Sequence, residues 1–435
     1  MSSQSLSKII TEKEFLPLVY QASVNLFKAL NYLKKDSSEI TKTYYAALNK
    51  ETDLFEDFLD NHGARENRTW VVFSESVASI RNFAIAGFQL RHVLDRYETY
   101  ALGDSKRDTA HFQKKADDAL NYINNSILAF YAIIKKEGQK NGLAITRSCC
   151  KEEDFSEIHV SKRLPKNLYA KDIGDEERII ALARRFRNVV KHIKDINIGR
   201  FYDKKIDIPV IPHIIDETKI HIWKNKLHDI QSDYDTHIKH TALEKSDKNL
   251  RRLRSFASLV LHLLEMVRWL SHFFERHGDE VRHGEIKEEF TKTVDREKGF
   301  DVIINFAIFF SEDYLEKGKL IAEKILSQYT IKTQYTLPIP RPLGFHARPA
   351  GYVSLIVNEH GTDVYLLVDG KKFNAKSVLS LMEAGGIIAD KKYKEAVFEG
   401  DKRVLDDIKI LAENNYCEDC EIPRALNYVR ILRNK

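Results

Sequence analysis

The sequence contains few of the residues that mark several common classes of protein. Four cysteines in 435 residues are too few for a disulfide scaffold, and nine prolines and eighteen glycines favour long helices over many turns. No apolar run approaches the ~20 residues of a bilayer-spanning helix, and the first residues lack the apolar stretch of a secretory signal. We therefore expect a cytoplasmic protein with no membrane insertion.

An excess of charge of one sign is also absent. Lysine and arginine total 69 against 64 aspartates and glutamates, a net charge of +5. A surface that binds nucleic acid needs a concentrated basic field, so the sequence predicts no nucleic-acid partner. Hydrophobic residues make up 43% and charged residues 31%, which is a globular composition, and the length indicates two or three domains.

Residues 1–330 have the pattern of a helical bundle. Between residues 255 and 277, apolar side chains recur at the i, i+3, i+4, i+7 spacing of a helix packed on other helices. Similar stripes occupy residues 15–33, 74–97, 112–136, 175–196 and 302–329. One stretch, 204–213, has two prolines and β-branched residues and is predicted to be extended or a loop. The function of this predicted helical domain is not indicated by any motif.

The pattern changes after residue 330. Three prolines in 336–342 end the preceding helix and allow only an edge strand or an extended linker. Short alternating segments follow, which predict the order β-α-β-β-α-β-α, with a helix that begins near Ser377 and ends at Gly385 and Gly386. We predict an open-faced α+β sandwich over 333–416, followed by a C-terminal tail, 417–435, that can form a short helix.

The segment 344–350, G-F-H-A-R-P-A, carries the chemistry of the chain. Pro349 is tolerated only in the first turn of a helix, which places His346 at or just before the helix N-cap. The free amides of Ala347 and Arg348 and the positive end of the helix dipole favour a phosphate, and the Arg348 guanidinium adds a fixed cation. A nucleophilic imidazole beside such a cradle predicts reversible phosphoryl transfer to and from His346.

Two segments carry a resemblance to a known family. The residues at 344–350 and N-A-K-S-V at 374–378 resemble the signature segments of HPr, the histidine phosphocarrier of the bacterial phosphoenolpyruvate-dependent phosphotransferase system. The resemblance implies that His346 accepts phosphate on Nδ1 from an Enzyme I-like donor and passes it to an Enzyme IIA-like acceptor. It implies that Arg348 helps to hold the phosphoryl group, and that Ser377 is a candidate target of an HPr kinase. No Enzyme I or Enzyme IIA pattern is found in residues 1–330.

Simpler interpretations stand beside these. His346 can be a surface histidine that caps a helix, and Ser377 is well placed as an N-cap with no kinase involved. The lone C-x-x-C at 417–420 is weak evidence for zinc or redox chemistry, and free thiols are favoured. A single Glu-x-x-His at 280–283 has no second copy, so the sequence predicts no metal and no cofactor.

The sequence thus predicts a phosphocarrier or phosphorelay regulator, a carrier rather than an enzyme with conventional turnover. Its helical domain would bind a partner or sense a signal. Two alternatives remain open. The first is a regulatory protein that binds other proteins through an HPr-like fold without phosphoryl transfer. The second is a helical part with catalytic activity of its own, which a polar pocket inside the bundle would favour.

Overall fold

The computed structural model describes residues 9–35, 40–156, 164, 176–194, 216–277, 290 and 292–433. The predicted extended stretch 204–213 and the Glu-x-x-His at 280–283 lie outside the described residues. The chain forms two compact units. The first unit comprises Met1–Tyr169, Val189–Ser232 and Arg254–Glu316, and the second comprises Ala170–Asn188, Asp233–Leu253 and Lys317–Lys435.

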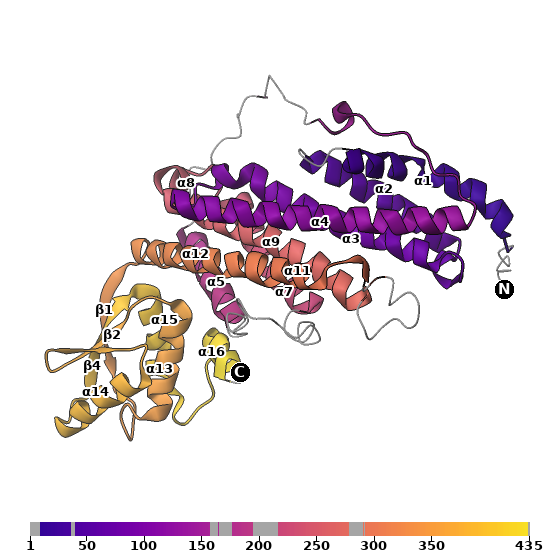
Figure 1. Ribbon diagram of the computed structural model, residues 1–435. Coiled ribbons are helices and arrows are strands. Elements are labelled where there is room, and N and C mark those ends of the chain that lie inside the picture. The colour runs from indigo at the N-terminus through magenta and orange to yellow at the C-terminus, as the bar shows by residue number, and fades with distance from the viewer. Residues whose placement is uncertain are drawn as a thin grey trace. The chain divides into compact units, whose positions relative to one another are not determined.

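Long helices build the first unit, as the apolar stripes predict. Figure 1 shows α1 to α4 as long rods in indigo and purple. Their bounds are Glu12–Lys35, Lys42–Asn61, Val71–Arg96 and Lys106–Lys140. Apolar side chains on the facing sides of these helices are buried, and α3 packs against both α2 and α4. Helix α2 was not among the predicted stripes. Thr41 and Ser105 cap α2 and α4 by accepting backbone hydrogen bonds, which fixes where these helices begin.

Further helices complete the helical part of the chain. Helices α5, α7, α9 and α12 each have residues in both units, α8 belongs to the second unit, and α11 belongs to the first. Their bounds are α5 Glu176–Lys194, α7 Glu217–His237, α8 Ala242–Ser246, α9 Lys248–His277, α11 Arg296–Asp301 and α12 Phe309–Gln328. A π-helical stretch, Val302–Ile308, joins α11 to α12. The predicted helices at 175–196, 255–277 and 302–329 are therefore present.

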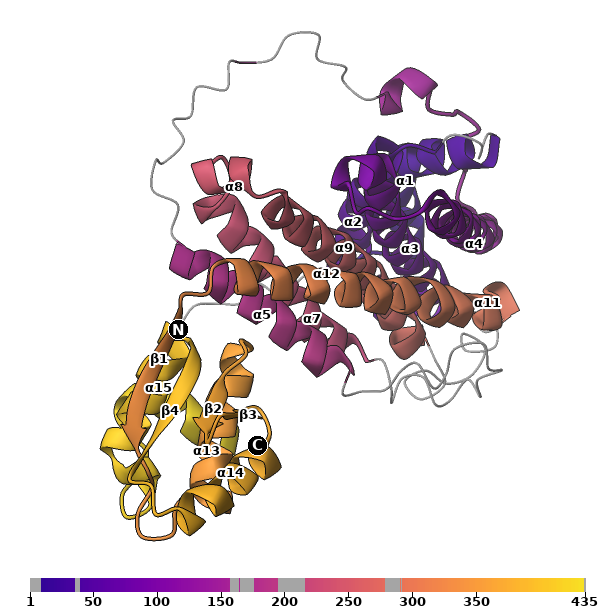
Figure 2. The same ribbon diagram turned by 90° about the vertical axis from the view of Figure 1, so that its left-hand side faces the viewer.

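A four-stranded antiparallel sheet lies in the second unit, in the strand order β1-β4-β2-β3. The strands are β1 Lys332–Pro338, β2 Tyr365–Val368, β3 Lys371–Asn374 and β4 Glu395–Asp401. The helices that accompany them are α13 Ala347–His360, α14 Val378–Asp390 and α15 Lys402–Glu413, shown in orange and yellow in Figures 1 and 2. The predicted order β-α-β-β-α-β-α is confirmed, and strand β1, which ends at Pro338, lies at an edge of the sheet.

The core of this α+β domain lies on one face of the sheet. Alternate residues of β2 and β4 are buried, among them Leu366 and Phe398, and α13 and α15 supply buried residues such as Val353 and Ile408. This alternation is the pattern of a sheet covered by helices on one side. After α15 the chain continues through two short 3-10 turns, Asn415–Cys417 and Arg424–Leu426, into α16, Asn427–Arg433.

The prediction that α14 ends at Gly385 and Gly386 is wrong. The helix runs on to Asp390, and both glycines lie inside it. A Cβ atom on Gly385 would lie 2.7 Å from the carbonyl oxygen of Phe345, whereas a Cβ on Gly386 would meet nothing within 4 Å. Gly385 therefore allows the loop before His346 to approach the helix closely, and it is not a C-cap.

None of the helices in the described part of the chain is both long enough and apolar enough to cross a bilayer.

Candidate functional site

His346 is the N-cap of α13, where the sequence predicts it to be. The turn before it depends on Gly344, which has φ +68° and whose carbonyl accepts a hydrogen bond from the His346 amide at 2.9 Å. Pro349 is buried in the first turn of the helix, where its missing N–H costs nothing. The Arg348 amide donates to Nδ1 of His346 over 3.5 Å, so this nitrogen faces the helix N-terminus.

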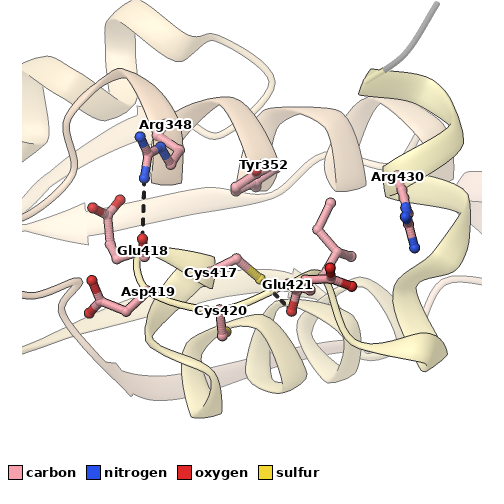
Figure 3. Close-up of a pocket in the computed structure, with 9 residues that line it drawn as sticks. Arg348, Tyr352, Cys417, Glu418, Asp419, Cys420, Glu421 and Arg430 are labelled. Carbon is pink, nitrogen blue, oxygen red and sulfur yellow. Dashed lines mark hydrogen bonds between the residues drawn. The ribbon is translucent and has the colours of Figure 1, made fainter.

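The two residues after His346 remain accessible. Ala347 and Arg348 are both exposed in the first turn, where helix amides have no intrahelical partner. The Arg348 guanidinium donates from Nη1 to the backbone oxygen of Glu418 at 3.2 Å (Figure 3). The residues predicted to hold a phosphoryl group therefore lie together at one helix end.

Glu418 is a residue of this site that the sequence did not reveal. Its Oε1 lies 2.9 Å from Nε2 of His346, and the two side chains are 9% and 31% exposed respectively. The pair is a contact at ion-pair distance, and neither atom forms a hydrogen bond within the described residues. Glu418 lies seventy positions after Arg348 and reaches the site through tertiary packing. The sequence therefore signals only that the chain continues beyond the sandwich.

An open cavity of about 800 Å³ adjoins the site. It lies between the first turns of α13 and the C-terminal segment, and Figure 3 shows Arg348, Tyr352 and Arg430 projecting from the two helices that border it. The remaining lining residues are Cys417, Glu418, Asp419, Cys420, Glu421 and Ile422. The surroundings of the histidine thus mix cations from helices with carboxylates from one loop.

The two cysteines of the C-x-x-C segment differ in their surroundings. Cys417 is buried, Cys420 is exposed, and both are free thiols. Burial, together with the neighbouring Cys420, raises the pKa of Cys417 to about 11, so its thiol stays protonated at neutral pH. Within the described residues, no group of three or more histidine, cysteine or acidic side chains could hold a metal ion.

Ser377 is the N-cap of α14, and its hydroxyl accepts a hydrogen bond from the Ser380 amide at 3.2 Å. The side chain is half-buried. Capping accounts for a serine at this position, and the geometry adds nothing for or against a kinase.

Large apolar side chains are exposed near the start of α14 and in the loop before His346. Leu379 is 77% exposed, Leu343 is 73% exposed, and Met382 is 38% exposed. Val378 packs partly against the core instead. All three side chains are available to contact another protein.

A second polar cavity, of about 480 Å³, lies in the first unit, between α4 and the segment around α11. Asp118, Asn121 and Lys298 are among its lining residues. Lys298 forms an ion pair with Asp295 at 3.6 Å, and Asp301 accepts a hydrogen bond from Asn305 at 2.7 Å. These contacts show no pairing of a nucleophile with a base among the described residues, so the cavity supports no particular reaction.

Comparisons with known proteins bear on the C-terminal domain alone. Residues 333–387 match the family model described as the PTS HPr component phosphorylation site, where PTS is the phosphotransferase system. Neither the search of curated proteins nor the search of solved structures finds a match. The matched residues include His346, Arg348 and Ser377, and the sheet and helices have the order expected of an HPr-like sandwich. The C-terminal domain of this protein is therefore HPr-like, a domain of the phosphocarrier type.

Proposed function

We propose that this protein accepts a phosphoryl group on Nδ1 of His346 and transfers it to a protein partner. One observation carries the proposal: His346 caps α13 with Nδ1 facing the helix N-terminus, and Arg348 follows in the same turn. A phosphoryl dianion on Nδ1 would lie at the positive end of the helix dipole, close to free amides and a guanidinium.

The transfer step needs no proton from the protein. The Nδ1 electron pair forms a bond to the phosphorus of a phosphohistidine on an Enzyme I-like donor. The donor's own N–P bond breaks, and its electron pair returns to the donor imidazole. The reverse of this step passes the group to an Enzyme IIA-like acceptor. We infer that Arg348 and the amides of Ala347 and Arg348 bind the oxygens of the transferred group.

Protein partners would dock beside the histidine. Leu343 in the loop before His346, and Leu379 and Met382 on α14, expose apolar surface, and the HPr-like domain implies partners from the phosphotransferase system in general. Binding of this kind places apolar anchors at the centre of an interface and leaves the charged donor and acceptor groups to react. We propose that the helical part binds a further partner or senses a signal.

The alternative is a regulator that binds proteins through this domain without phosphoryl transfer. One observation favours it, because Glu418 contacts Nε2 of His346 and covers part of the ring. In that case, partner binding would survive the loss of the imidazole, and the domain would carry no phosphoryl group.

Incubation of the full chain with Enzyme I and labelled phosphoenolpyruvate distinguishes the two. We expect acid-labile, base-stable label on the wild type and on Ser377→Ala, which keeps every group of the proposed cradle. We expect no label on His346→Ala, and labelling of Arg348→Ala slowed by about 10–100-fold, as for the loss of one charged hydrogen-bonding group. Equal label on His346→Ala, or none on the wild type, would contradict phosphoryl transfer.

A further inference from the structure

The ring of His346 has different partners on its two nitrogens. Nδ1 accepts a hydrogen bond from the Arg348 amide at 3.5 Å, and Nε2 lies 2.9 Å from Oε1 of Glu418. An amide can only donate, so Nδ1 holds an electron pair, and a neutral ring then carries its proton on Nε2, the nitrogen that faces the carboxylate. This is the tautomer in which Nδ1 is a nucleophile.

The position of Glu418 is fixed by its neighbours on the chain. Tyr416 is fully buried, and its hydroxyl donates to the carbonyl oxygen of Pro338 at 3.0 Å. Its ring packs edge-on against the ring of Phe345, with the ring centroids 5.3 Å apart. Phe345 directly precedes His346. The contact between Phe345 and Tyr416 therefore holds the histidine and the glutamate at a constant separation, because each follows an anchored aromatic residue by one or two positions.

The backbone that carries Glu418 has an unusual conformation. Asn415, Tyr416 and Cys417 have φ values of +45°, +52° and +54°. Three consecutive residues other than glycine in the left-handed region cost free energy, and such a conformation persists only where surrounding contacts impose it. Strained backbone of this kind is most often found beside functional groups.

The end of the segment is also anchored to the domain. The Tyr428 hydroxyl donates to Oδ2 of Asp407 at 2.6 Å, and Leu426 and Val429 are fully buried. The segment from 415 to 429 therefore packs on the domain as part of its structure, and Glu418 is presented from a supported loop.

We propose that Glu418 is a positioning residue for His346. Its carboxylate faces the protonated Nε2, keeps the ring in the tautomer with an open Nδ1, and blocks reaction at Nε2. When Nδ1 forms its bond to phosphorus, the proton stays on Nε2 and the ring becomes cationic, so the carboxylate compensates the charge that develops. The role of Glu418 in phosphoryl transfer rests on the proposed function. The pairing of Glu418 with His346 does not depend on it.

Proton NMR of the full chain tests the pairing first. A ring N–H held by a carboxylate exchanges slowly and gives a resonance far downfield, which we expect in the wild type and which His346→Ala assigns by its disappearance. We expect the signal to vanish in Glu418→Leu and to remain, shifted upfield, in Glu418→Gln, whose amide oxygen still accepts. Glu413→Leu is the matched control, because Glu413 is an exposed carboxylate at the end of α15. Absence of the signal from the folded wild type, or its persistence in Glu418→Leu, would overturn the proposal.

Phosphorylation with phosphoramidate, a small donor that needs no protein partner, tests the role. We expect ³¹P NMR to show the phosphoryl group of His346 on Nδ1 in the wild type and in Glu418→Gln, and on both nitrogens in Glu418→Leu. The rate on Nδ1 should fall about 10-fold or more in Glu418→Gln because the compensating charge is lost. A faster rate in Glu418→Gln would make Glu418 an inhibitor and overturn the proposal. If His346 accepts no phosphoryl group from any donor, the proposed function fails, while the downfield resonance still decides the pairing.

Discussion

His346 caps a helix and presents a reactive nitrogen at the same time. Capping needs only an acceptor, which Nδ1 provides to the Arg348 amide over a long distance of 3.5 Å. A bond of this length is weak, so little free energy is lost when Nδ1 turns its electron pair to another group. Glu418 acts on the opposite nitrogen, and the two tasks therefore do not compete for the same atom.

The thiols beside Glu418 should differ in reactivity. At pH 8, iodoacetamide should label Cys420 first and Cys417 much more slowly, since burial raises the pKa of Cys417 to about 11 and leaves about one molecule in a thousand as thiolate. Tandem mass spectrometry of the tryptic peptide that contains both cysteines measures the two rates.

Cys420→Ser is the control, because it removes the thiol that is labelled faster, so that the labelling rate of Cys417 can be measured by itself. Raising the pH to 10 should accelerate the labelling of Cys417 strongly, because the thiolate fraction rises as the pH approaches its pKa of about 11. Equal labelling of Cys417 and Cys420 within the first minutes at pH 8 would show that Cys417 is not shielded.

At the level of elements, α14 and the loop before α13 are fitted to each other. Gly385 lies where the backbone of Phe345 approaches the helix closely, and the Phe345 ring packs against the rings of Phe398 and Tyr416, with ring centroids 5.9 Å and 5.3 Å apart. The loop that carries His346 is thus fixed by a helix, a strand and the C-terminal segment together.

Adjacent glycines of α14 should respond oppositely to the same substitution. Gly385→Ala should lower the free energy of unfolding by about 1–3 kcal/mol, because the new methyl group would lie 2.7 Å from a backbone oxygen. Gly386→Ala should raise it by about 0.5–1 kcal/mol, because alanine favours a helix and the space is open. Urea denaturation of both variants checks the pair, and a loss of stability in Gly386→Ala as large as that in Gly385→Ala would argue against the close approach.

For the whole molecule, the two compact units provide separate cores and separate spectroscopic signals. The three tryptophans, Trp70, Trp223 and Trp269, all belong to the first unit, and the sheet belongs to the second. The net charge of +5 among 133 charged groups, 69 basic and 64 acidic, gives no general attraction for phosphate. Specificity for a phosphoryl group must therefore arise at His346 and its immediate neighbours.

Substitutions in the two cores should be separable. Phe398→Leu, at a fully buried position of β4, should lower the stability of the second unit by about 1–2 kcal/mol and reduce protection from amide exchange across 332–401. The tryptophan fluorescence transition should stay in place. Phe83→Leu, at a fully buried position of α3, should shift that transition and leave exchange in the sheet unchanged. A joint shift of both signals in either variant would show that the units unfold as one.

The sequence by itself determined the features that depend on neighbouring residues. Apolar spacing defined most of the helices, turn residues indicated the order of strands and helices along the chain, and Pro349 placed His346 at a helix N-cap, because periodicity and capping operate over a few positions. The tertiary structure decided what lies opposite those residues. Glu418 reaches Nε2 of His346 only after the chain has passed through the sheet and α15, and Gly385 serves a close approach that its own helix gives no sign of. Contacts between residues far apart in the sequence depend on how the helices and strands pack, and a local sequence pattern does not specify that packing.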